Sequence, residues 1–134
     1  MAVGANNFVM KKLFFILVMV PASFLASQSL NDITRAISSG DATALGQYFD
    51  QSVEVGVLDK EDVYSKTEAI TIVKDFFTRY KPQSFSQMHQ GENESNSQYC
   101  IGNMVTSGGS FRVYIYLNKT GDKLLIQEIR FDPE

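Results

Sequence analysis

The segment Asp59-Lys60-Glu61-Asp62 holds the densest group of chemically useful side chains in this 134-residue chain. Its three carboxylates could offer oxygen ligands to a hard cation such as Ca²⁺. The segment lacks the sixth-position glycine and the distant bidentate glutamate of an EF-hand loop, so a solvated hairpin turn is the favoured interpretation. The single histidine excludes a zinc site built from several histidines, and we expect no metal and no cofactor.

His89 and Cys100 are the only histidine and the only cysteine of the chain. An imidazole suits general acid–base work because its pKa lies near neutrality. His89 has no partner close in the sequence, so a surface or structural role is the alternative. Cys100 can form no disulfide within the chain, and its β-rich surroundings favour a buried apolar group over a nucleophile.

The N-terminal stretch predicts export from the cell. Lys11 and Lys12 precede an apolar run over residues 13–20, and small residues follow at 26–29. This order is typical of a secretory signal peptide. The apolar run is too short to cross a membrane, and no cysteine stands directly after it to become a lipid-bearing mature N-terminus. We therefore expect a periplasmic or secreted protein.

Two regions follow from this interpretation. Residues 1–27 form the signal peptide, with cleavage after Ser27 or Ser29, and the true start is Met1 or Met10. Residues 28–134 form a single domain with a modest core.

The charge of the chain disfavours nucleic acid as a partner. The sequence carries 12 basic and 15 acidic side chains, a net charge of −3, and the basic residues are scattered. A nucleic-acid binder usually has a basic face or stripe. We therefore expect no nucleic-acid partner.

Two short helices are expected at the start of the domain. Apolar residues recur at helical spacing over 30–37, from a start near Ser29. Gly40 suits the left-handed position after a helix end, and Asp41 is a typical N-cap for the second helix.

A strand and the strongest helix of the chain come next. Valines alternate with polar or small residues over 52–58, which predicts a strand, and residues 63–64 could return as its hairpin partner. The broad apolar stripe over 68–80 predicts a helix capped by Ser65 or Thr67.

The second half of the domain has the period of a sheet. Apolar and polar residues alternate in four segments, at 84–90, 98–106, 110–117 and 123–131. The expected helices precede a meander of strands along the chain. This order predicts an α+β domain whose helices cover one face of an antiparallel sheet.

This order of elements resembles the nuclear transport factor 2-like superfamily. Three segments carry the likeness: Ser39-Gly40-Asp41-Ala-Thr-Ala-Leu45-Gly-Gln-Tyr-Phe49, the strand at 53–57, and Tyr64-Ser-Lys-Thr-Glu-Ala-Ile70. The likeness covers residues 30–131 and implies a cystatin-like cone, in which a curved antiparallel sheet wraps around N-terminal helices. The chain is also similar to an exported bacterial family of this fold with no assigned function.

The superfamily includes ketosteroid isomerases, which use a carboxylate base with a tyrosine and a protonated aspartate as oxyanion donors. Aligned on Gly40-Asp41 and Phe49, the tyrosine position falls on Ile33 and the base position on Val57. Both are apolar, so the resemblance argues against this chemistry and assigns no catalytic residue.

The resemblance implies a cone interior surrounded by bulky apolar side chains. A packed core is one interpretation, and a partly open apolar pocket with a few polar groups is the other. In the second interpretation the ligand contacts Tyr48, Tyr64, Phe77, His89, Tyr99 and Met104.

Arg112, Tyr114 and Tyr116 share one face of an expected strand. Either Gln127 with Ile129 or Glu128 with Arg130 would face them from the next strand. Such cross-strand pairs are ordinary sheet stabilisers, but tyrosine and arginine are also enriched at protein interfaces. The outer sheet face often packs against a second subunit in this superfamily, so a homodimer through these residues is a further hypothesis.

Three functions stay open at this point. The leading hypothesis is an exported non-enzymatic domain that binds a small apolar or amphipathic ligand or a protein partner. The alternatives are a hydrolase, isomerase or dehydratase that uses the cone pocket, and a structural homodimerisation module. An enzyme would place Glu54, Asp59 or His89 in a concave pocket with a perturbed pKa. A binder would have an apolar pocket without such a group.

Overall fold

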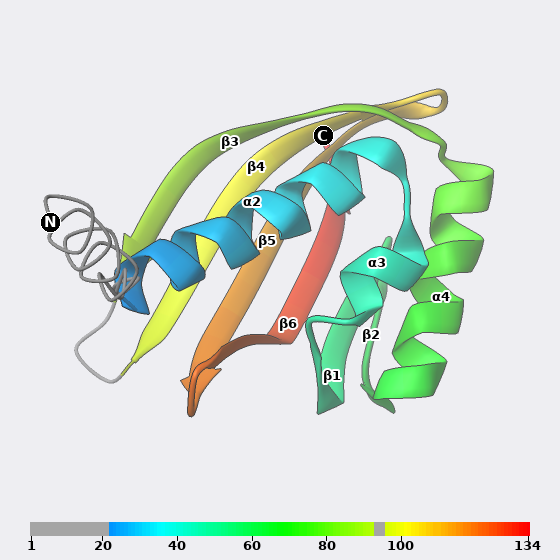
Figure 1. The fold of residues 1–134 in the computed structure, drawn as a ribbon. Helices are drawn as coiled ribbons and strands as arrows, with labels where there is room; N and C mark the ends of the chain where they lie inside the picture. Colours follow the sequence, from blue (N-terminus) through cyan, green and yellow to red (C-terminus); the bar gives the residue numbers. More distant parts are fainter. Residues whose placement is uncertain (1–21, 93–95) are drawn as a thin grey trace, which may run out of the picture.

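The computed structural model describes residues 22–92 and 96–134, which form the three helices and six strands drawn in Figure 1. Residues 1–21 of the predicted signal peptide lie outside the described residues, and residues 22–27 belong to the first helix. Within the described ranges, no helix is both long enough and apolar enough to cross a membrane.

Helix α2 (Ala22–Ser39) buries Leu30, Ile33 and Ile37 against the sheet, as their spacing predicts. It begins earlier than expected, because neither glycine nor proline interrupts the chain between Ala22 and Ser39. The helix ends at Gly40, which adopts a left-handed φ of 70° that is cheap only for glycine.

The short helix α3 (Ala42–Gly46) follows directly. The Asp41 carboxylate accepts a hydrogen bond from the Ala44 amide at 3.0 Å, which confirms Asp41 as the N-cap. Leu45 is fully buried, so this joint anchors the chain before the sheet begins.

Strands β1 (Phe49–Val57) and β2 (Lys60–Ser65) form an antiparallel hairpin. Its turn consists of Leu58 and Asp59, and Leu58 takes a φ of 58° to make it. The expected charged turn over residues 59–62 is therefore shorter than predicted. Glu61 and Asp62 belong to β2, where alternation sends their side chains to opposite faces.

Helix α4 (Lys66–Arg79) confirms the strongest predicted helix. The Ser65 hydroxyl accepts a hydrogen bond from the Glu68 amide at 3.3 Å, so Ser65 rather than Thr67 is the cap. The stripe of Ala69, Val73, Phe76 and Phe77 is buried.

The four remaining strands confirm the predicted meander: β3 (Pro82–Glu92), β4 (Ser97–Thr106), β5 (Gly109–Thr120) and β6 (Lys123–Pro133). The sheet order is β2-β1-β6-β5-β4-β3. All neighbours are antiparallel except β1 and β6, which run parallel. Figure 1 shows α2 crossing one face of this curved sheet and α4 lying at its β1–β2 end. The α+β fold class is therefore confirmed.

Aromatic rings fill the space between the helices and the sheet. The Phe76 ring lies 5.1 Å from that of Phe111 and 4.8 Å from that of Phe131, centroid to centroid. Tyr80 packs on the same cluster, with 5.2 Å between its ring centroid and that of Phe76. Aromatic pairs at such separations add stabilisation beyond the burial of their surface. The packed-core interpretation therefore describes this part of the cone.

Candidate functional site

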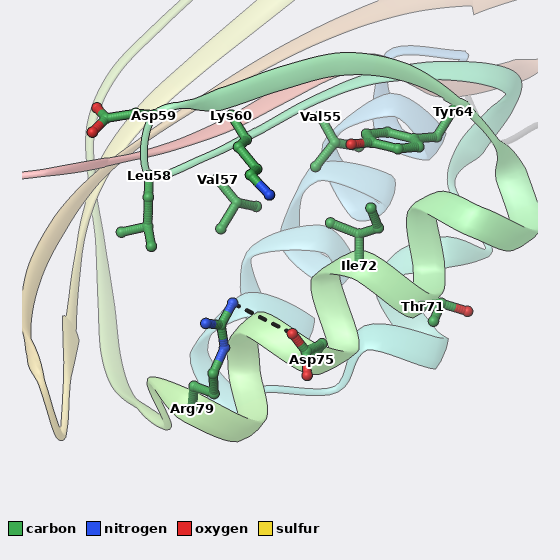
Figure 2. Close-up of a pocket in the computed structure, with 10 residues that line it drawn as sticks. All are labelled: Val55, Val57, Leu58, Asp59, Lys60, Tyr64, Thr71, Ile72, Asp75 and Arg79. Carbon is green, nitrogen blue, oxygen red and sulfur yellow. Dashed lines mark ion pairs between the residues drawn. The ribbon is translucent and has the colours of Figure 1, made fainter.

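A cavity of about 560 Å³ lies between the β1–β2 hairpin and helix α4, and Figure 2 shows the residues around it. Sites for small molecules commonly enclose about 300–1,000 Å³. The cavity is lined by Val55, Val57, Leu58, Asp59, Lys60, Tyr64, Thr71, Ile72, Asp75 and Arg79. We call it the hairpin cavity.

One side of the hairpin cavity is apolar. Val55 and Val57 share a face because alternate residues of a strand point the same way. Tyr64 lies on the neighbouring strand, and Ile72 rises from α4 toward the same space (Figure 2). An apolar molecule bound against this wall would therefore be shielded from water.

The other side of the hairpin cavity is charged. Figure 2 shows the Lys60 side chain extending into the cavity and the Asp59 carboxylate pointing away from it. Arg79 Nη2 lies 3.3 Å from Asp75 Oδ2, one helical turn earlier, and both side chains are mostly exposed. Exposed pairs of this kind contribute only about 0.3–0.5 kcal/mol. The cavity thus combines an apolar wall with two basic and two acidic residues, of which Asp75 is paired with Arg79 and Asp59 points outward.

Of the six residues predicted to contact a ligand, Tyr64 lines the hairpin cavity. Tyr48 lies at a separate cavity of about 430 Å³ that also includes Asp32 and Lys123. Its hydroxyl donates a hydrogen bond to Asp32 Oδ2 at 3.0 Å. Partial burial, followed by this hydrogen bond and the negative charge of Asp32, raises the pKa of Tyr48.

The other four predicted ligand residues lie elsewhere. Phe77 and Met104 are buried in the core, and His89 is exposed on the edge strand β3. Tyr99 covers Gly91, where a Cβ would lie 2.3 Å from the tyrosine ring. The structure therefore does not bring the six residues together, because Phe77 and Met104 pack in the core, whereas Tyr99 lies on the other face of the sheet.

We call the sheet face opposite the helices the open face. Its central residues are half-buried and come from three strands: Tyr99, Ile101, Tyr114, Tyr116, Glu128 and Arg130. The predicted interface residue Arg112 lies at its margin, 3.2 Å from a Glu134 carboxylate oxygen. Glu128 and Arg130, rather than Gln127 and Ile129, are the residues that face the tyrosines. The three predicted interface residues therefore share one surface.

Three carboxylates from different strands meet on the open face. One ligand oxygen each from Glu54, Glu61 and Glu128 lies within 4.8 Å of the others. A hydrogen bond with Glu128, partial burial and the Glu128 charge together raise the pKa of Glu54, against opposing effects of Glu61 and Arg130. Three such oxygens could hold a hard cation, but Arg130 Nε already lies 3.7 Å from Glu128 and supplies positive charge.

Cys100 is fully buried in β4, as its surroundings predict. Burial disfavours the thiolate and raises the pKa of Cys100 to about 11. The thiol is therefore unsuited to act as a nucleophile at neutral pH.

Most residues of the hairpin cavity were not singled out from the sequence. Two signals could have found them. Val57 and Lys60 flank a two-residue turn and pair with each other, so they share a face. On α4, Asp75 and Arg79 follow Ile72 by three and by seven residues. This spacing places the three side chains in a second stripe beside the buried one.

The curved sheet and its helices define a nuclear transport factor 2-like fold. A protein of this class with unknown function from Silicibacter pomeroyi is 12% identical, with a TM-score of 0.62 over 87% of this chain and 100% of that chain. A de novo designed protein with a curved β-sheet is 14% identical, with a TM-score of 0.64 over 79% of this chain and 97% of that chain. Both likenesses concern the fold alone.

The chain belongs to the DUF4783 family, a domain of unknown function, whose model matches residues 30–132. A DUF4783 family protein from Bacteroides ovatus is 29% identical, with a TM-score of 0.74 over 77% of this chain and 93% of that chain. One from Bacteroides uniformis has the same identity and TM-score, with 78% and 95% covered. No curated protein matches the chain. The predicted nuclear transport factor 2-like fold is therefore confirmed, and so is the resemblance to a family with no assigned function.

Proposed function

We propose that this protein is an exported, non-enzymatic domain that binds a small amphipathic ligand in the hairpin cavity. The observation that carries the proposal is the combination of an apolar wall and basic groups in one concave space. Pockets for small ligands typically have this composition, with an apolar lining and a few polar groups that fix orientation. The basic and apolar N-terminal stretch supports export.

The positions of the side chains with a raised pKa favour binding over catalysis. The raised pKa values belong to Tyr48, Glu54 and Cys100, none of which lines the hairpin cavity. Asp59 lines the cavity, but its carboxylate points outward (Figure 2). An enzyme would require a tuned acid or base aimed at the bound molecule.

The test uses N-phenylnaphthylamine, a neutral fluorescent probe that brightens in apolar surroundings. We expect the purified protein to enhance its fluorescence, and Ile72→Trp to abolish the enhancement because the larger ring fills the cavity. Val63→Trp is the matched control, since Val63 is 63% exposed on the opposite face of the same hairpin. Equal probe binding by the Ile72 variant and the wild type would disprove the cavity as the site.

A homodimer through the open face is the second candidate function. The observation that favours it is the gathering of Tyr114, Tyr116 and Arg130 at half-buried positions on a face that no described helix covers. Tyrosine and arginine are the residues that protein interfaces enrich. This candidate does not conflict with ligand binding, because the hairpin cavity lies on the helix side of the sheet.

A further inference from the structure

We infer that the ligand of the hairpin cavity is a monoanionic amphiphile, with a carboxylate head between Lys60 and Arg79 and an apolar tail against Val55, Val57 and Ile72. This inference rests on the proposed function and names the chemical class of its ligand. It covers free fatty acids and similar acyl carboxylates, which share this chemistry.

The charged side chains that line the cavity indicate a ligand with a negative head group. Four charged side chains line the space, and two of them, Asp75 and Arg79, form an ion pair with each other. The Asp59 carboxylate points away from the cavity, whereas the Lys60 side chain extends into it (Figure 2). Lys60 forms no ion pair with any residue in the described part of the chain. Asp62 shares this face of β2, but its carboxylate accepts a hydrogen bond from the Val63 amide at 2.8 Å. Lys60 therefore presents at the cavity an exposed positive charge that no ion pair neutralises.

Arg79 retains donors for a second acceptor. The Asp75 contact uses one nitrogen of the guanidinium, at 3.3 Å. A guanidinium has five N–H donors, and carboxylates are its preferred planar partners. Figure 2 shows Arg79 rising from α4 toward the side of the cavity that Lys60 enters from the hairpin. A carboxylate between them would be held from both walls.

The apolar wall indicates that the rest of the ligand is uncharged and apolar. Val55, Val57 and Ile72 are aliphatic, and they are buried or half-buried, whereas Lys60 and Arg79 are exposed. A second charge on the ligand would have no partner at this wall, and burying it would be costly. A head with one negative charge and an uncharged tail therefore fits the cavity best.

The experiment compares decanoate with decanol, which has the same tail and no charge, by calorimetric titration of the purified protein below micelle-forming concentrations. We expect decanoate to bind at least about tenfold more tightly than decanol, a difference of about 1.4 kcal/mol. Lys60→Gln should weaken decanoate binding about tenfold and leave decanol unchanged. Lys60→Arg should restore it, because that variant keeps the charge.

Lys74→Gln is the matched control, since it removes one exposed positive charge from α4 outside the cavity lining. It should bind decanoate as the wild type does, and all variants should melt at similar temperatures. Equal binding of decanoate and decanol, both blocked by Ile72→Trp, would overturn the carboxylate inference and leave the proposed function intact. Absence of binding by both compounds and by N-phenylnaphthylamine would overturn both proposals.

Discussion

The Arg130 guanidinium lies over the ring of Tyr114, with 5.1 Å between its Cζ and the ring centroid. The two residues are directly opposite each other on β6 and β5. The stem of Arg130 also covers Gly56 on β1, where a Cβ would lie 3.0 Å from Arg130 Cγ. One side chain thus spans three neighbouring strands at the centre of the open face.

Tyr114→Glu should separate the proposed homodimer into monomers. The new carboxylate would be desolvated in an interface of tyrosines and would weaken dimerisation by at least about tenfold. Sedimentation equilibrium of the wild type and the variant measures this. Thr78→Glu, on the exposed side of α4, is the control and should stay dimeric. A wild-type protein that is monomeric at every concentration tested would contradict the dimer.

Glu54→Gln should stabilise the protein at neutral pH. The pKa of Glu54 is raised above its ordinary value of 4.5 in the folded state, so ionisation favours the unfolded state. Wild-type stability is therefore lost as the pH rises from about 4.5 through the raised pKa, and the variant should not show this loss. Melting temperatures measured across this pH range test the prediction.

The control for this prediction is Glu92→Gln, which removes an exposed carboxylate at the far end of β3. Its melting temperature should follow that of the wild type at each pH. A variant at position 54 that is less stable than the wild type at neutral pH would show that the cluster with Glu61 and Glu128 is net stabilising instead.

Phe76→Ala should cost about 3–5 kcal/mol in the free energy of unfolding, the usual range for a buried phenylalanine. The ring is fully buried and contacts four other aromatic rings. Urea unfolding followed by circular dichroism gives the value. Met88→Ala, at a side chain that is 50% exposed, should change it by less than about 0.5 kcal/mol. A small effect at position 76 would mean that the core is loosely packed.

Cys100 should react with iodoacetamide only after unfolding. A pKa of about 11, against an ordinary value of 9.0, lowers the thiolate fraction at pH 8 by roughly a hundredfold, and burial blocks access as well. The same shift favours the unfolded state as the pH rises above 9. Mass spectrometry of native and urea-unfolded samples measures the labelling, and Cys100→Ala shows the background. Fast labelling of the folded protein would contradict the buried position.

Local signals predicted the helices and the strand faces well. Asp41 and Ser65 cap their helices because a short polar side chain before an apolar stripe satisfies free backbone amides wherever it occurs. The alternation around Phe111 and Val113 likewise places Tyr114 and Tyr116 on the open face. These features depend only on residues that are close in the sequence, so they can be predicted from short stretches of it.

Features that join distant segments could not be predicted in this way. The parallel pairing of β1 with β6 brings Glu54 opposite Glu128, and no periodicity within either strand indicates that register. The hairpin cavity likewise depends on the distance between α4 and the sheet. That distance is set by the packing of the whole core. For the same reason the pattern could not tell that Phe77 and Met104 would fill the concave side.

The position of β6 also bears on when the domain can fold. This strand lies between β1 and β5, yet it is the final described element to leave the ribosome. The hairpin and the meander cannot join into one sheet before it is made, and pairings between such distant segments form slowly. If the chain is exported, as proposed above, this order keeps the sheet incomplete during synthesis and so lengthens the time in which an unfolded chain could be translocated.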